Sequence, residues 1–138
     1  MNDIFILDAC ALIALLAGEE GAEKVRDIIQ DAIDKNVTVK MNQINLLEVY
    51  YHLLNSFDQK TANKALGKIH EFPIEIISEL SPDVFKEAGR IKSKYKIPLG
   101  DSIAIAECII KNGFLVTSDH TDFEKLNNTE NIKIFWFR

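Results

Sequence analysis

Short apolar runs alternate along the chain with longer segments in which apolar residues recur every three or four positions. The apolar runs predict five strands, at residues 4–7, 37–41, 74–77, 114–117 and 132–137. The longer segments predict helices in the gaps between these strands. One of them, residues 103–110, is apolar nearly all round, so we expect a buried helix that ends at Asn112-Gly113.

This alternation indicates one α/β domain that comprises residues 1–138. Strands that are connected through helices form a parallel sheet, and helices cover both of its faces. We therefore predict a three-layer α/β/α sandwich with a mostly parallel central sheet of four to five strands. The sequence contains no internal repeat, low-complexity tract or long linker that would divide it further.

Four acidic residues fall at the junctions between these predicted elements. Asp8 directly follows the first strand, Asp119 comes just after the fourth, and Glu48 and Asp101 open helical patterns. In an open α/β sheet such junctions lie at one edge, outside the carboxyl ends of the strands. Carboxylates gathered there repel one another unless a cation or protons intervene. The sequence therefore predicts a metal-binding acidic cluster.

Each of these acids also has a purely structural interpretation. Asp8, Asp101 and Asp119 could each cap a helix, and Glu48 stands three residues after Asn45, which is close to the spacing of a capping box. Taken singly, capping explains each acid as well as metal binding does. Taken together, the metal site is favoured, because Glu48 has apolar neighbours and Asp101 precedes a buried helix. A carboxylate that is buried there without a partner or a metal is costly.

A ligand set made only of oxygen atoms selects Mg²⁺ or Mn²⁺ over zinc or copper. Carboxylate-held ions of this kind serve phosphate chemistry, in which the metal activates a water and offsets charge on the phosphate. No histidine is required for that chemistry. His52, His70 and His120 lie on scattered segments, and we interpret them as surface or half-buried residues; only His120, beside Asp119, is a minor candidate for contact with a substrate.

The composition narrows the class of protein further. Hydrophobic residues make up 47% of the chain, which supports a real core, and the net charge of −5 does not by itself suggest a nucleic-acid-binding protein. Cys10 and Cys108 are isolated, which argues against a zinc site and fits a reducing cytoplasm. Asp3 and Asp8 interrupt the apolar N-terminal segment, so we expect no signal peptide. No apolar run is long enough to cross a membrane, and we expect a soluble, cytoplasmic protein.

Four motifs together resemble the PIN domain, a metal-dependent nuclease fold, and within it the VapC-like toxins of type II toxin–antitoxin pairs. The motifs are ILDACAL (residues 6–12), NLLEV (45–49), PLGDSIAIA (98–106) and LVTSDHTDF (115–123). The resemblance implies that Asp8, Glu48, Asp101 and Asp119 hold one or two Mg²⁺ or Mn²⁺ ions and that the protein cuts RNA. It also implies a homodimer that is silenced by an antitoxin protein, whose tail lies across the active-site cleft.

The chain departs from the family pattern at two positions near these acids. Cys10 stands where the family often has Ser, Thr or Asn, and Ser118 where it often has a basic residue or Asn. Neither change removes a carboxylate, but both leave open a second interpretation, a PIN-like scaffold that binds RNA or a protein partner without cutting. Thr117 matches the family's hydroxyl near the site and is a candidate substrate-binding residue. Asp122 is either a fifth acid of the site or an exposed residue in a first helical turn.

Two further groups of residues each have two interpretations. The basic run Arg90, Lys92, Lys94 and Lys96 is either a solvated helix end or a substrate-binding rim that follows the RNA phosphates. The aromatic residues on the helix that carries Glu48 indicate packing in the core and in a dimer, or else an antitoxin groove; they are Tyr50, Tyr51 and Phe57.

Two other acidic α/β proteins are excluded by named residues. A phosphoacceptor receiver domain needs an aspartate at the end of its third strand, where this chain has Ser78-Glu79 after Ile77. It also needs a lysine after the fifth strand, where this chain has Arg138. A haloacid-dehalogenase-like phosphatase needs Asp-x-Asp after the first strand, and Cys10 occupies the second of these positions.

Overall fold

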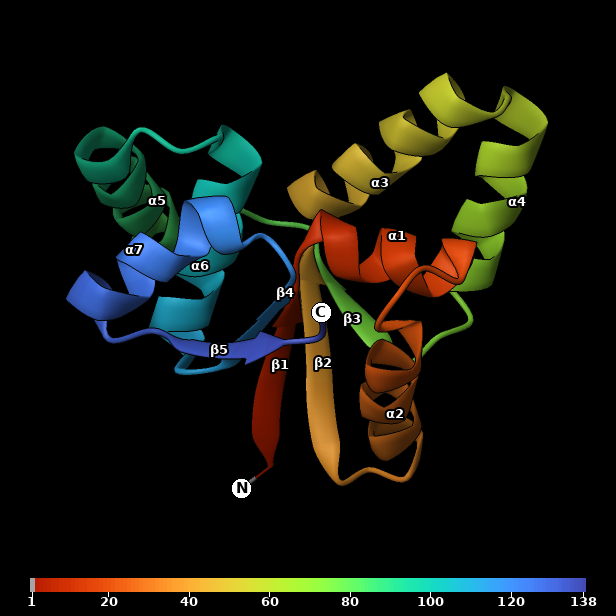
Figure 1. The fold of residues 1–138 in the computed structure, drawn as a ribbon, viewed down its shortest axis with the longest axis horizontal. Helices are drawn as coiled ribbons and strands as arrows, with labels where there is room; N and C mark the ends of the chain where they lie inside the picture. The colour runs from red at the N-terminus through yellow and green to blue at the C-terminus, as the bar shows by residue number, and fades with distance from the viewer. Residues whose placement is uncertain (1) are drawn as a thin grey trace.

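The computed structural model describes residues 2–138 and forms an α/β fold in which strands alternate with single helices or pairs of helices (Figure 1). The elements, in chain order, are β1 (Asp3–Leu7), α1 (Ala9–Ala17), α2 (Ala22–Ile33), β2 (Val37–Asn42), α3 (Gln43–Ser56), α4 (Gln59–Ile69), β3 (Ile74–Ile77), α5 (Pro82–Tyr95), α6 (Leu99–Lys111), β4 (Phe114–Thr117), α7 (His120–Glu130) and β5 (Lys133–Trp136).

The five strands form one sheet in the order β3-β2-β1-β4-β5, and every neighbouring pair is parallel. The predicted α/β sandwich with a central parallel sheet is therefore confirmed. The chain builds outward from β1 to β3 on one side and then continues with β4 and β5 on the other. Strand order thus reverses between β1 and β4, and such a switch point leaves a crevice at the carboxyl ends of the two strands.

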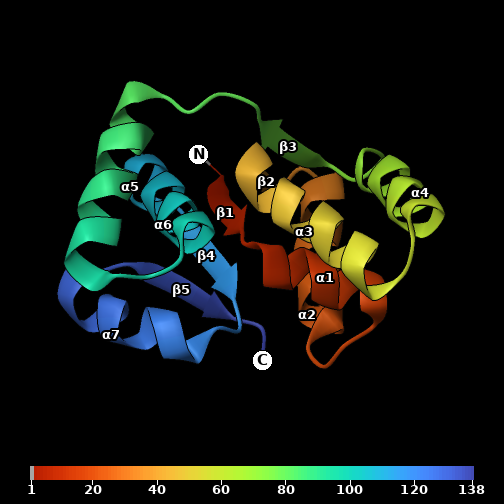
Figure 2. The same cartoon turned by 90° about the horizontal axis from the view of Figure 1, so that it is seen from above.

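Helices cover both faces of the sheet. α1 to α4 pack together on one side, and α5 to α7 lie on the other (Figures 1 and 2). Neighbouring residues of one strand point to opposite faces. Leu7 and Val116 accordingly belong to the core beneath α1 to α4, whereas Ile6 and Leu115 belong to the core beneath α6 and α7. This explains why the strands read as nearly continuous apolar runs.

The helix α6 is the most deeply buried helix among residues 2–138, as its sequence predicts. Every residue from position 102 to position 108 is buried, and Asn112 ends the helix in the left-handed conformation with φ 51°. Gly113 follows directly, in close contact with the carbonyl oxygen of Ile4, so a side chain at this position would collide with β1. Within residues 2–138, no helix is both long and apolar enough to cross a membrane.

Candidate metal centre

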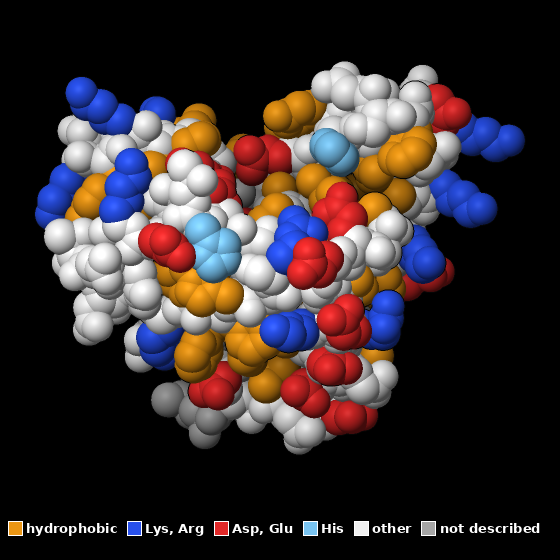
Figure 3. All heavy atoms as spheres, viewed as in Figure 1, with side chains coloured by type: hydrophobic (Ala, Val, Ile, Leu, Met, Phe, Trp, Pro, Cys, Tyr) orange, Lys and Arg blue, Asp and Glu red, His pale blue; other side chains and the backbone are white. Residues whose placement is uncertain are grey.

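A pocket of about 210 Å³ opens at the carboxyl edge of the sheet, and all four predicted acids line it. Asp8 comes from the end of β1, Glu48 from the middle of α3, Asp101 from the first turn of α6, and Asp119 from the residue before α7. In Figure 3, acidic side chains gather in the hollow between the two groups of helices. The pocket therefore lies over the switch point between β1 and β4, as the fold class leads one to expect.

Asp8 is the most deeply buried of the four, with 4% of its surface exposed. Its side chain caps α1 by accepting a hydrogen bond from the backbone of Ala11 at 3.0 Å, and it accepts a second from the hydroxyl of Thr117 at 2.5 Å. The thiol of Cys10 donates to the same carboxylate at 3.0 Å. Burial raises the pKa of Asp8 to about 6, although these hydrogen bonds oppose the shift. Asp8 thus caps a helix and lines the pocket at once.

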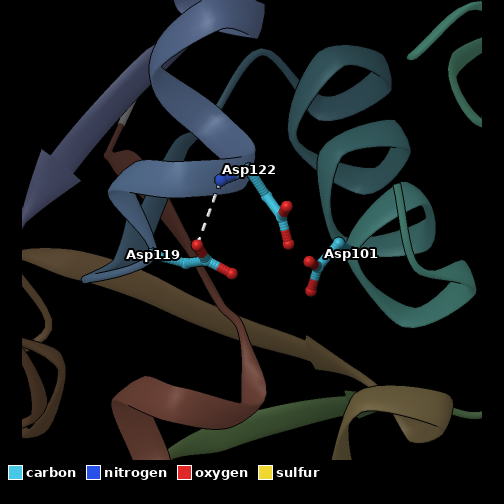
Figure 4. Close-up of side chains that lie close together, drawn as sticks. All are labelled: Asp101, Asp119 and Asp122. Atoms are coloured by element: carbon cyan, nitrogen blue, oxygen red, sulfur yellow. Dashed lines mark hydrogen bonds between the residues drawn. The ribbon is translucent and has the colours of Figure 1, made fainter. Parts of the chain in front are cut away.

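Asp101 does not cap α6, because that helix begins at Leu99 with Pro98 as its cap. The carboxylate is free of that structural role and faces Asp119 and Asp122, with one oxygen of each residue within 4.8 Å of the others (Figure 4). Burial raises the pKa of Asp101 to about 8, and the contact with Asp122 and the charge of Asp8 add to the shift. Such crowding fits a site that is completed by a cation.

Asp119 and Asp122 reach this cluster from the start of α7. Asp119 caps that helix by accepting a hydrogen bond from the backbone of Asp122 at 3.1 Å. Burial raises the pKa of Asp119, and the carboxylate of Asp122 adds to the shift. Of the two interpretations of Asp122, the structure favours the first, since its side chain turns toward Asp101 and Asp119 (Figure 4).

Glu48 lies across the pocket, where Asn45 holds it and links it to Gly100. Neither Asn45 nor Gly100 was assigned to the site from the sequence. Asn45, fully buried one helical turn earlier, donates to Glu48 at 3.2 Å and to the carbonyl oxygen of Gly100 at 3.0 Å. The alternative interpretation of Glu48 as part of a capping box is therefore wrong, because α3 begins at Gln43 with Asn42 as its cap. Burial raises the pKa of Glu48. The only sequence signal for the contact between Asn45 and Glu48 is their spacing of three residues, which also fits a capping box.

Thr117 and Cys10 hold acids of the pocket in place through hydrogen bonds. Thr117 is fully buried; its hydroxyl donates to Asp8 and accepts from the backbone of Asp119 at 3.1 Å, so it holds the two acids in place and does not reach the surface where a substrate would lie. Burial and the charge of Asp8 raise the pKa of Cys10 to about 12, which keeps its thiol protonated and able to donate. The unusual cysteine therefore preserves the hydrogen bond that a hydroxyl would make.

The basic run before Asp101 does not line the pocket. Arg90 forms an ion pair with Glu87 and another with Glu130 at 2.7 Å, and Lys94 lies 3.4 Å from Glu130. Lys92 donates to the carbonyl oxygen of Ile97 at 3.0 Å. Three of the four predicted rim residues thus have partners within the protein, and the fourth, Lys96, is exposed at the end of α5.

The remaining predicted residues divide between the pocket and the outer surface. His52 lines the pocket, although the sequence gave no reason to place it there. Tyr51 and Phe57 are 53% and 63% exposed, so neither packs in the core, whereas the hydroxyl of Tyr50 donates to Asn63 at 2.6 Å. His120 stacks flat on Trp136, with ring centroids 4.0 Å apart. The aromatic residues of α3 therefore include an outward-facing pair.

The donor set of the pocket fits a hard divalent cation. Its charged donor atoms are carboxylate oxygens. The one sulfur atom that lines the pocket belongs to Cys10, whose raised pKa keeps the thiol protonated. Burial, together with the nearby carboxylates, raises the pKa values of Asp101 and Asp119, and a bound cation would lower them again. Asp101, Asp119 and Asp122 are the nearest to one another and could share one ion.

Comparisons with known proteins agree with this arrangement. The family model of the PIN domain matches residues 5–128. Among solved structures, VapBC2 from Rickettsia felis bound to a promoter DNA fragment superposes with a TM-score of 0.74 at 19% identity, over 96% of this chain and 98% of that one. A toxin–antitoxin complex from Klebsiella pneumoniae gives a TM-score of 0.66 at 19% identity, over 96% and 97% of the two chains.

VapC20 of Mycobacterium tuberculosis, a toxin that cleaves the sarcin–ricin loop, superposes with a TM-score of 0.66 at 13% identity, over 88% of this chain and 94% of that one. At such identities the superpositions show a shared fold. None of the curated proteins matches the sequence. The match of the family model covers most of the chain, from β1 into α7, and includes every acid of the pocket. The chain therefore belongs to the PIN domain family.

Proposed function

We propose that the protein is a Mg²⁺- or Mn²⁺-dependent endoribonuclease that hydrolyses RNA phosphodiester bonds in the cytoplasm. The observation that carries the proposal is the convergence of Asp8, Glu48, Asp101 and Asp119 on one pocket from four separate segments. Capping alone does not account for it, since Asp101 and Glu48 cap no helix. Membership of the PIN domain family supports the same chemistry.

The residues of the pocket would have two roles: to bind the ion and to orient the attacking water. Asp8, Asp101 and Asp119 would hold the ion directly or through water, and Asp122 is close enough to assist them. When bound, the ion supplies a nucleophile by acidifying its water and offsets charge on the scissile phosphate. Glu48, on the opposite wall and fixed by Asn45, would ligate the ion or orient the attacking water. The protein itself needs no nucleophilic side chain.

We further propose that the protein is the toxin of a type II toxin–antitoxin pair and forms a homodimer. Support comes from the similar fold of chains from toxin–antitoxin complexes, and from an apolar stripe on α3. The stripe consists of Ile44, Leu47, Tyr51 and Leu54, which are spaced as one helix face, and of Phe57, which directly follows the helix; all five are at least 36% exposed. Exposed apolar stripes of this kind mark protein interfaces, and one residue in the middle of the stripe, Tyr51, also lines the pocket.

A nuclease assay tests the catalytic proposal and separates it from a scaffold that binds without cutting. Purified protein should cut single-stranded or structured RNA with Mn²⁺ and lose activity in EDTA. Asp8→Asn and Asp101→Asn keep the shape of the pocket but remove charge that holds the ion, so activity should collapse while the melting temperature stays within a few degrees. Equal cleavage in EDTA, or full activity in Asp8→Asn, contradicts the mechanism. RNA binding without cleavage under all metal conditions favours the scaffold.

A further inference from the structure

An aromatic pair lies near the pocket, with Trp136 on β5, the strand next to β4, and His120 at the start of α7. Trp136 is the last residue of β5 and lies in register with Thr117, whose hydroxyl holds Asp8. The imidazole of His120 stacks on the indole with an angle of 11° between the ring planes. Figure 3 shows histidine and basic side chains over α7 and the end of β5, just below the acidic hollow. A flat ring surface therefore lies one residue away from Asp119.

The imidazole is held in this orientation from both of its nitrogen atoms. Nδ1 is 2.7 Å from the carboxylate of Glu124, and Nε2 is 2.9 Å from the carbonyl oxygen of Arg138. His120 is nevertheless exposed, so the ring presents one face to the indole and leaves its outer face to solvent. A ring that is fixed in this way is pre-organised for stacking and loses little conformational freedom when it binds.

Arg138, whose carbonyl oxygen contacts the imidazole of His120, connects to the pocket through its guanidinium group. Arg138 donates to the hydroxyl of Ser118 at 3.1 Å, and Ser118 lies 3.5 Å from the thiol of Cys10, which lines the pocket. Arg138 also donates to the carbonyl oxygen of Glu20 at 3.2 Å and lies 3.3 Å from Glu19, in an ion pair whose side chains are 31% and 43% exposed. Exposed pairs of this kind contribute little, so a phosphate can replace the carboxylate.

These features supply what a nucleotide needs beside the cutting site. Every base has a flat face that can stack on an aromatic ring, and a guanidinium binds the phosphate that precedes or follows it. The guanidinium of Arg138 also matters for phosphate binding because two other basic side chains, Arg90 and Lys94, are paired with Glu130. We propose that His120, backed by Trp136, stacks on a base of single-stranded RNA next to the scissile phosphate, and that Arg138 binds the adjoining phosphate. This subsite rests on the proposed ribonuclease function.

Binding measurements test the subsite without any need for cleavage. In an Asp101→Asn background with Mg²⁺, a fluorescently labelled single-stranded RNA octamer is compared with an abasic octamer of the same length. His120→Ala should weaken binding of the RNA at least about fivefold and that of the abasic octamer less than about twofold, because only bases stack. Arg138→Ala should weaken both and reduce the slope of binding against salt by about one. His120→Phe, which keeps the flat ring, should bind like the parent.

Matched controls and a direct signal complete the design. His70→Ala and Arg26→Ala remove exposed side chains from the end of α4 and from α2, respectively, and both variants should bind RNA within about twofold of the parent. Trp136 is the only tryptophan in the chain, so the change in its emission on binding should be large for the RNA octamer and much smaller for the abasic octamer.

The subsite is wrong if His120→Ala binds RNA as well as the His70→Ala control does, or if His120→Ala weakens binding of both octamers equally. If the wild type cleaves RNA but Trp136 emission does not change, the subsite alone is wrong. If the variants show the expected losses of binding but the wild type cleaves no RNA, only the proposed function is wrong.

Discussion

The carboxylate of Glu48 occupies the space that a Cβ atom on Gly100 would fill. The two residues lie on different helices, α3 and α6, and Asn45 joins them by donating to both. The residue next to Asp101 in the chain is therefore glycine for a packing reason, because any side chain there would displace the acid on the opposite wall of the pocket.

Gly100→Ala is expected to impair activity without impairing the fold. The added methyl group displaces Glu48, whose flexible side chain can move, while alanine within α6 favours the helix by up to about 1 kcal/mol. We expect kcat to fall by about tenfold or more, since small misplacements of catalytic groups are costly. Gly67→Ala, a helical glycine of α4 with open space around it, is the control and should keep full activity. Equal kcat values for the two variants would refute the positioning role of Gly100.

The raised pKa values of Asp8 and Asp101 predict opposite effects of pH with and without metal. Their folded pKa values of about 6 and about 8 exceed the usual value of 3.8, so the folded state holds more protons between about pH 4 and pH 8. Without metal, the stabilising contribution is complete below about pH 4 and is lost as the pH rises through 8. Mn²⁺ binds only the ionised groups, so it should raise the melting temperature more at pH 8 than at pH 5.5. An equal Mn²⁺ effect at both pH values, or an undiminished one in Asp101→Asn, contradicts this.

Loss of the Glu107 side chain is expected to destabilise the protein strongly, because this fully buried carboxylate is the hydrogen-bond partner of two other side chains. It accepts hydrogen bonds from Asn42 at 2.6 Å and from Lys111 at 2.5 Å, and Asn42 in turn caps α3, the helix that carries Glu48. Glu107→Ala leaves both partners unsatisfied and should lower the free energy of unfolding by about 3 kcal/mol. Glu107→Gln should lower it less, since its amide oxygen still accepts from Asn42. Urea denaturation gives the order, and equal losses would contradict it.

Glu130 should stabilise the protein at neutral pH and lose this effect in acid. Hydrogen bonds from Arg90 and then from Tyr95 hold its pKa at about 2, below the usual 4.5. A lowered folded pKa contributes stability that is complete above about pH 4.5 and disappears as the pH falls toward 2. Glu130→Gln should therefore lower the melting temperature at pH 7 and have little effect near pH 2.5. A similar decrease at both pH values would show that the ion pairs are not the cause.

Lys96 is the member of the basic run that remains a candidate for contact with RNA. It is exposed at the end of α5, whereas Arg90 and Lys94 bind Glu130. Lys96→Ala should weaken RNA binding and reduce its salt slope by about one, because one phosphate contact is lost. Lys94→Ala should change the slope less. Equal slopes for the wild type and Lys96→Ala would remove the basic run from the RNA path.

The sequence by itself determined the layers of the fold and the edge where the acids lie. Apolar runs and helical spacing report whether each segment is buried on one face or on both, and that property is local. The strand segments, the parallel sheet and the buried helix before Asn112 were therefore predicted and are confirmed. Asp8 and Asp119 follow strands directly, so the sheet topology alone carries them to the same edge.

Only the tertiary structure decided which side chains meet across the pocket. Asn45 touches Gly100, Thr117 touches Asp8, and Arg90 touches Glu130 from positions far apart in the chain. Such pairs depend on how helices and strands pack against one another, and no periodicity in the sequence records it. For the same reason, the sequence made Thr117 a candidate substrate-binding residue and could not decide whether the basic run is a solvated helix end or a rim, because exposure and charge partners are properties of the packed molecule.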